Sequence, residues 1–110
     1  MLGARVAVTG VGVVAPCGIG TEAFWDGLGT PVEPADRRPV EGFDPEHWFD
    51  NPKEARRTDR FAQFGLAAAQ MALDQAGDLG ADPDRSGVII GTGVGGLNTL
   101  EHGVQIYYTK

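Results

Sequence analysis

Two short runs of consecutive apolar residues stand out along the chain, each closed by glycine. Residues 5–12 are Arg-Val-Ala-Val-Thr-Gly-Val-Gly, and residues 86–91 contain Val88-Ile89-Ile90. Continuous β-branched runs of this kind are typical of strands that are buried on both faces of a parallel sheet. The pattern therefore predicts strands at residues 5–12 and 86–91.

Helical periodicity dominates between and after these runs. From Thr58 to Ala76 apolar residues recur every three to four positions, and Gly77 follows as a stop signal. A further helix is predicted over residues 97–108. Because a strand, a long helix and a second strand form a right-handed crossover between parallel strands, the sequence predicts an α/β fold.

Shorter elements are predicted from capping residues. Thr21 is expected to cap a helix over residues 22–28, and the pairs Asp44-Pro45 and Asn51-Pro52 each place a capping side chain before a proline, which favours a first helical turn. Residues 29–42 are rich in proline, glycine and charge and are expected to form a surface loop.

The predicted elements do not make a complete sheet. Two strands cannot close one, and two all-apolar strands need covering layers on both faces. We therefore expect residues 1–110 to be the amino-terminal part of a larger α/β domain, incomplete by itself.

Composition narrows the class of protein. The chain is 42% apolar and 22% charged, close to globular averages, and its 17 glycines indicate several tight turns or close backbone approaches. A formal net charge of −6 argues against a nucleic-acid-binding protein. No apolar run approaches the ~20 residues of a membrane span, and no signal-peptide pattern opens the chain. With Cys17 as its single cysteine, a cytoplasmic protein is expected.

Three segments together resemble the β-ketoacyl-acyl carrier protein synthases of the thiolase-like superfamily, particularly the elongating enzymes of dissociated fatty-acid and polyketide systems. They are residues 5–25, residues 53–77, which begin Lys-Glu-Ala-Arg-Arg-Thr-Asp-Arg-Phe, and residues 87–96, Gly-Val-Ile-Ile-Gly-Thr-Gly-Val-Gly-Gly. Their order and spacing carry the resemblance. It implies a thiolase-like fold, of which this chain is about the first quarter. Between Gly29 and Phe43 the chain departs from its relatives, which usually carry a longer excursion there.

The resemblance also implies an activity and its partners. Such enzymes condense an acyl thioester with malonyl-acyl carrier protein, with loss of carbon dioxide, and use a nucleophilic cysteine and two histidines that lie beyond the point matching Lys110. No catalytic residue is therefore assigned within this chain, and no cofactor or metal is expected. The implied partners are an acyl carrier protein bearing a phosphopantetheine-bound acyl or malonyl group, the remainder of the polypeptide, and a second subunit in a homodimer or a ketosynthase/chain-length-factor heterodimer.

Cys17 and two glycine-rich turns invite other hypotheses. Cys17 follows a strand-like segment, but no histidine or basic residue adjoins it, so we expect a small buried packing residue rather than the nucleophile. The turn Gly10-Val-Gly12 suggests dinucleotide binding, yet no second strand carries the acidic residue required, and packing of a strand against a helix is the favoured interpretation. The turn at residues 91–96 lacks the lysine of a phosphate-binding loop.

Two sets of residues are candidate binding sites. Val94, Leu97 and Leu100 lie three positions apart, so they share a face on a helix; core packing explains this pattern, and the resemblance implies that they line the acyl pocket.

The second set is basic. On pattern alone, a solvated helix face paired with Glu54 and Asp59 is favoured, whereas the resemblance implies that Lys53, Arg56 and Arg57 dock the acidic carrier protein. His47 and the remaining histidine, His102, have no metal-ligand spacing, and no function is assigned to them.

Three functions stay open from the sequence: a condensing β-ketoacyl synthase, a non-catalytic partner of the chain-length-factor type, and a free-standing α/β binding module. A nucleophilic cysteine in a strand-to-helix turn after Lys110 would distinguish the first from the second. A gene that ends at Lys110 would indicate the third.

Overall fold

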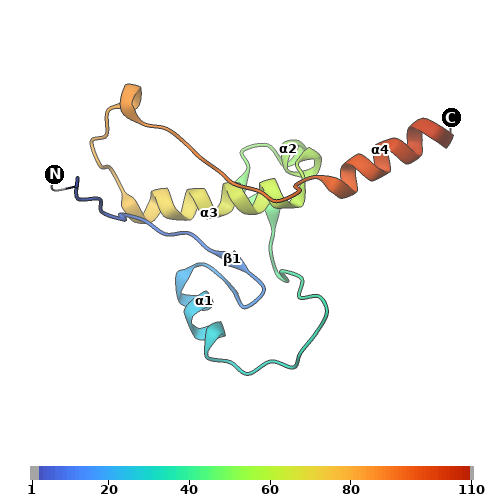
Figure 1. Cartoon of the computed structure of the whole chain (residues 1–110), viewed down its shortest axis with the longest axis horizontal. Coiled ribbons are helices and arrows are strands. Elements are labelled where there is room, and N and C mark those ends of the chain that lie inside the picture. The colour runs from blue at the N-terminus through green and yellow to red at the C-terminus, as the bar shows by residue number, and fades with distance from the viewer. Residues whose placement is uncertain (1–2, 110) are drawn as a thin grey trace.

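A computed structural model describes residues 3–109. Figure 1 shows helices arranged around one long central helix, with the two ends of the chain far apart. The elements in chain order are β1 (Val14–Ala15), β2 (Gly18–Ile19), α1 (Thr21–Leu28), the 3-10 helix η1 (Pro45–Trp48), α2 (Pro52–Arg57), α3 (Arg60–Ala76), the 3-10 helix η2 (Pro83–Arg85) and α4 (Leu97–Thr109).

Side-chain caps start the short helices where the sequence predicts them. Asp44 accepts a hydrogen bond from the Glu46 amide at 3.0 Å at the start of η1, and Asn51 accepts one from the Lys53 amide at 3.0 Å at the start of α2. Each helix opens with proline, whose missing N–H leaves no donor unpaired there. Both predicted helical turns are thereby confirmed.

The predicted long helix is confirmed as α3, which ends at Gly77 with a φ of 65°. It begins at Arg60 rather than at Thr58, because Thr58 and Asp59 both have extended backbone and separate α2 from α3. The helix predicted over residues 97–108 is confirmed as α4.

The hairpin of β1 and β2 was not predicted. Val14 pairs with Ile19 and Ala15 with Gly18 in antiparallel register. Gly20 then takes a φ of 89° and donates its N–H to the Val13 carbonyl at 2.9 Å. Gly20 is therefore the N-cap of α1, and the prediction that Thr21 caps this helix is wrong by one residue.

The segment before the hairpin packs on α3 through its glycines. A Cβ built on Gly12 would lie 1.8 Å from the Ala68 carbonyl oxygen, and one on Gly10 would lie 1.9 Å from that of Ala72. Between them, the Val11 amide donates to Gln75 Oε1 at 2.6 Å. The favoured interpretation of this turn as a packing contact with a helix is confirmed.

Neither predicted apolar strand forms a strand in the described part of the chain. Ladder hydrogen bonds define a strand, and residues 5–12 and 86–91 have no strand beside them to supply such bonds. The expected burial is also absent: Val6 is 91% exposed and Ile89 is 100% exposed. Both segments nevertheless run from the C-terminal end of α3 toward its N-terminal end (Figure 1).

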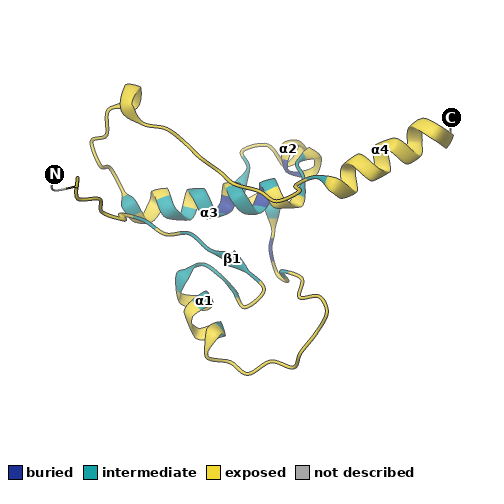
Figure 2. Ribbon diagram, in the orientation of Figure 1, coloured by how far each residue is buried: buried dark blue, intermediate teal, exposed yellow. Residues whose placement is uncertain are grey.

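The buried side chains lie near the first half of α3, where Figure 2 shows the dark blue segments. They are Phe43, Ala55, Gln63 and Ala67. Gln63 Nε2 donates to the carbonyl oxygens of Ala55, at 2.7 Å, and Thr58, at 3.0 Å, and so joins the end of α2 to α3. The Phe43 and Phe64 rings meet edge to face with centroids 5.0 Å apart.

Outside this small core the chain is open. The radius of gyration of the chain as a whole is 17.8 Å, whereas a compact domain of this length has about 13 Å. Within residues 3–109, no helix combines the length and apolar character needed to cross a membrane.

Candidate functional site

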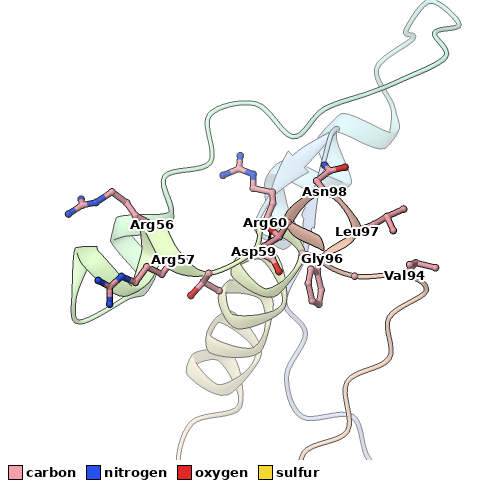
Figure 3. A pocket seen from close by; sticks show the side chains of 12 residues that line it. Arg56, Arg57, Asp59, Arg60, Val94, Gly96, Leu97 and Asn98 are labelled. Atoms are coloured by element: carbon pink, nitrogen blue, oxygen red, sulfur yellow. Dashed lines mark hydrogen bonds between the residues drawn. The ribbon is translucent and has the colours of Figure 1, made fainter. Parts of the chain in front are cut away.

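Two segments far apart in sequence meet where α2 passes into α3. Residues 56–61 and 94–99 together line an open cavity of about 610 Å³ (Figure 3). The first segment contains the break at Thr58 and Asp59, and the second contains the turn that leads into α4. The structure thus brings part of each predicted binding set to one place.

The contact between the two segments depends on two glycines and one carboxylate. A Cβ on Gly95 would lie 2.5 Å from the ring of Phe61, and one on Gly96 would lie 2.8 Å from Asp59 Oδ2. Gly96 has a φ of 77°, which disfavours any other residue. The Thr99 hydroxyl, in the first turn of α4, donates to Asp59 Oδ1.

The predicted docking residues Lys53, Arg56 and Arg57 are all exposed on α2. Arg56 Nη1 forms an ion pair with Glu46 Oε1 at 2.7 Å, so the expected pairing with Glu54 and Asp59 is wrong. Glu46 is brought close because η1 packs on α2. Within residues 3–109, the side chains of Lys53 and Arg57 make no ion pair, and both remain available to an external anion.

Arg60 differs from the other cations of this region. Its guanidinium carbon lies 4.8 Å from the ring centroids of both Phe43 and Phe64. A guanidinium held over aromatic faces contributes to packing. Arg60 is therefore anchored to the buried part of the chain, although it also lines the cavity.

The predicted acyl-pocket residues are divided between two cavities. Val94 and Leu97 line the cavity already described, whereas Leu100 lines a second one of about 640 Å³ with Val104, Tyr107 and Tyr108 among its neighbours. Val94 precedes α4, so the prediction that it shares a helix face with Leu97 and Leu100 is wrong. All three predicted side chains are exposed in this chain.

The charged and apolar parts lie on opposite sides of the contact. Figure 3 shows Arg56 and Arg57 extending outward from α2, while Leu97 and Val94 extend away on the other side of Asp59 and Gly96. The cations can recognise an anionic partner, and the apolar side chains can contact a hydrocarbon. Neither cavity is lined by a cysteine or a histidine.

Cys17 lies elsewhere, in the turn of the hairpin. Its side chain is exposed, so the prediction of a buried packing residue is wrong. The Cys17 backbone does pack closely: a Cβ on Gly27 would lie 1.9 Å from the Cys17 carbonyl oxygen. This approach aligns α1 with the turn and leaves the sulfur outside.

Sequence patterns alone did not identify Asp59 and Thr99 as neighbours. Asp59 has the position of an ordinary helix cap, and Thr99 is one polar residue in a helical pattern. The available signal was the pair Gly95-Gly96 before a predicted helix, because adjacent glycines suggest close approach to another part of the chain.

Comparison with known proteins gives consistent matches. The family model described as β-ketoacyl synthase, N-terminal domain, matches residues 30–109. A polyketide β-ketoacyl synthase 1 of Streptomyces cyaneus is 42% identical over an alignment 116 residues long. The alignment covers 89% of this chain and 27% of that protein. A 3-oxoacyl-[acyl-carrier-protein] synthase 2 of Synechocystis is 37% identical over an alignment 124 residues long. That alignment covers 96% of this chain and 29% of the relative. The chain thus spans less than a third of the length of these relatives, and no solved structure matches it.

Proposed function

The chain belongs to the β-ketoacyl synthase family, and from this premise we propose that it forms the amino-terminal part, residues 1–110, of a thiolase-fold enzyme that elongates acyl thioesters. In this proposal the enzyme condenses an acyl group with malonyl-acyl carrier protein in fatty-acid or polyketide synthesis. The cavity at the α2–α3 junction is the single observation that supports a role for this segment in substrate binding. It has cationic side chains at its rim and apolar side chains along its wall.

The proposed fold uses the apolar segments that are exposed here. Residues 5–12 precede α3 in the sequence and residues 86–91 follow it, and both segments run in the same direction in space. Two parallel strands joined by a crossover helix have this arrangement. We assign their pairing and covering layers to other parts of the complete polypeptide. Burial on both faces would then explain why Val88, Ile89 and Ile90 are consecutive.

Carrier-protein docking is proposed for Lys53, Arg56 and Arg57. Exposed cations on a chain of net charge −6 concentrate positive potential at one place, which would steer an acidic carrier toward α2. Among the three, Lys53 and Arg57 have no ion pair within residues 3–109, whereas Glu46 already neutralises part of the Arg56 charge. We therefore expect Arg57 to contribute more than Arg56.

Binding of the acyl chain is proposed for Val94, Leu97 and Leu100. Their exposed apolar surface would be covered by the hydrocarbon on one side and by the remaining polypeptide on the other. The two cavities that these residues line share the wall formed by Asp59, Gly95, Gly96 and Thr99.

The covalent chemistry is assigned to residues beyond Lys110. A cysteine thiolate would take the acyl group from its thioester and release the carrier thiol. Loss of carbon dioxide from the malonyl group would then leave an enolate whose carbon attacks the acyl carbon and expels the thiolate, forming the new carbon–carbon bond. Two histidines would stabilise the enolate oxygen.

Charge reversal at the proposed docking residues tests this function in the complete enzyme. Arg57→Glu should slow carrier-dependent condensation about tenfold at low salt and less at high salt, because steering is screened. Turnover of a small acyl thioester that needs no docking should change little. Arg56→Glu should have a smaller effect, and Arg85→Glu, at η2 near the other end of α3, is a control with the same change in charge.

The outcomes separate the competing functions. If both rates fall together in Arg57→Glu, the residue is structural and docking is placed elsewhere. If the wild-type enzyme is never acylated by an acyl thioester, as judged from its intact mass, a non-catalytic partner of the chain-length-factor type is favoured. The relatives named above are synthases, which favours the condensing enzyme.

A further inference from the structure

Asp59 occupies the N-cap position of α3, but its side chain does not cap that helix. An aspartate at this position ordinarily accepts hydrogen bonds from amides in the first turn that follows. Here Oδ1 accepts from the Thr99 hydroxyl instead, 40 residues further along the chain. The carboxylate therefore holds the start of α4 rather than the start of its own helix.

The backbone of Gly96 is shaped to receive this carboxylate. Its φ of 77° and the 2.8 Å that would separate an added Cβ from Asp59 Oδ2 both favour glycine. Its carbonyl oxygen accepts the Leu100 amide at 3.0 Å, so Gly96 is also the residue from which the first turn of α4 is built. Asp59 and Gly96 thus fix where α4 begins.

This contact stands between the two cavities. Asp59 and Thr99 line both of them, while Leu97 belongs to one and Leu100 to the other. Side chains along α4 are exposed throughout the described residues, so little else within this chain restrains the helix. A change at Asp59 would consequently move the apolar residues on both sides of it.

Resting on the function proposed above, we propose that Asp59 is a positioning residue: through Thr99 it fixes the first turn of α4 relative to α2, and so determines which acyl chains the pocket accepts. Asp59 acts on selectivity by placing Leu97 and Leu100. The partner that it discriminates is an acyl thioester, by the length of its hydrocarbon.

The test compares Thr99→Val with Thr99→Ser in the complete polypeptide. Valine keeps the shape of threonine and removes the donor, whereas serine keeps the hydroxyl. Loss of a hydrogen bond to a carboxylate at an exposed site should raise exchange of the Leu100 amide, which bonds the Gly96 carbonyl, and of the Glu101 amide after it about fivefold. Asp59→Ala should do the same, and the double variant should exchange no faster than either single variant, because both remove one interaction.

The second measurement is the ratio of condensation rates with long and short acyl thioesters. We expect Thr99→Val to change this ratio about fivefold, with the melting temperature unchanged, and Thr99→Ser to keep the wild-type ratio. Equal exchange and equal ratios in Thr99→Val and Thr99→Ser would overturn the proposal. Faster exchange with an unchanged ratio would also overturn it, since the contact would then be structural only.

Failure of the proposed function gives a different result. Wild-type protein that forms no acyl-enzyme and no condensation product would overturn the function, whereas the exchange measurement would still report whether Asp59 and Thr99 fix the start of α4. A wild type that condenses normally, together with a Thr99→Val variant of wild-type selectivity, would overturn the positioning role alone.

Discussion

The chain up to the end of α3 at Ala76, the first part, differs from the second part, which follows it. Among the described residues, every buried side chain lies between Gly10 and Gly77, whereas residues 77–95 and 97–109 are exposed. The first part packs through small groups: Gly10 and Gly12 meet backbone atoms of α3. The second part carries larger apolar side chains that remain exposed, such as Val88, Ile89 and Tyr108, and Figure 2 colours its ribbon as exposed almost throughout.

The difference indicates where each part obtains its stability. Where backbone approaches backbone closely, surface is buried without large side chains. The first part can therefore pack against α3 without elements from outside the chain. Consecutive large residues such as Val88, Ile89 and Ile90 gain stability only when other elements cover them. In the second part, Gly95, Gly96 and Thr99 contact Asp59 and Phe61 of the first.

Ile89 gives the largest expected difference, because it is the most exposed large apolar residue among those described. If the complete enzyme covers this residue, Ile89→Ala should lower its free energy of unfolding by about 2–5 kcal/mol, because a buried methyl-rich side chain would leave a cavity. In residues 3–109 nothing covers Ile89, which is fully exposed, so this loss would come from contacts with the remaining polypeptide. Urea unfolding of the complete polypeptide, with and without the substitution, measures the effect.

A negligible effect of Ile89→Ala would mean that residues 86–91 stay uncovered in the complete polypeptide. The proposed parallel sheet would then be wrong. A loss of about 2–5 kcal/mol would support covering layers from outside this chain.

The packed part is tested at Gly12. Gly12→Ala places a methyl group 1.8 Å from the Ala68 carbonyl oxygen, which must be relieved by movement of backbone. We expect the free energy of unfolding to fall by about 3 kcal/mol. Gly65→Ala is the matched control in α3, because among the described residues its added Cβ has no heavy atom within 4 Å apart from nearby backbone of the same helix, and alanine favours a helix by about 0.5–1 kcal/mol.

Urea unfolding of Gly12→Ala and Gly65→Ala measures both effects. Equal stability of the two variants would show that the amino-terminal segment does not approach α3 closely. It would also remove the main contrast between the two parts of the chain.

Local signals predicted the helices well. The Asp44-Pro45 and Asn51-Pro52 pairs specify their own first turns, because the capping side chain and the proline act within a few residues. The Gly77 stop signal is equally local. The start predicted at Thr58 was two residues too early, because Thr58 and Asp59 have extended backbone and the helix begins at Arg60.

Strand predictions depended on partners that no local pattern can supply. Residues 5–12 and 86–91 have suitable side chains, but a strand exists only when a neighbouring strand provides its hydrogen bonds. The site residues divide in the same way. Spacing along α2 placed Lys53, Arg56 and Arg57 together, whereas the Arg56–Glu46 ion pair and the Asp59–Thr99 hydrogen bond required the tertiary structure.

Gln63 joins the buried part of the chain to α2, the helix that carries the proposed docking residues. Gln63 is 7% exposed, and its amide donates to carbonyl oxygens at the end of α2, those of Ala55 and Thr58. Gln63→Leu removes both of these hydrogen bonds, together with the one that Gln63 Oε1 accepts from Arg60 Nη1 at 3.4 Å, which should lower the free energy of unfolding by about 1–2 kcal/mol. Gln70→Leu is the control, since Gln70 bonds Asp74 on the exposed face of α3.

Hydrogen exchange at α2 gives the decisive measurement for Gln63. Because the lost bonds hold the last turn of α2, exchange there should rise in Gln63→Leu and not in Gln70→Leu, for which we expect a change below about 0.5 kcal/mol. Carrier-dependent turnover should fall modestly with it, since Arg56 and Arg57 lie in that turn. If exchange at α2 is unchanged while global stability falls, Gln63 supports α3 alone, and the orientation of α2 depends on the packing of η1 against it.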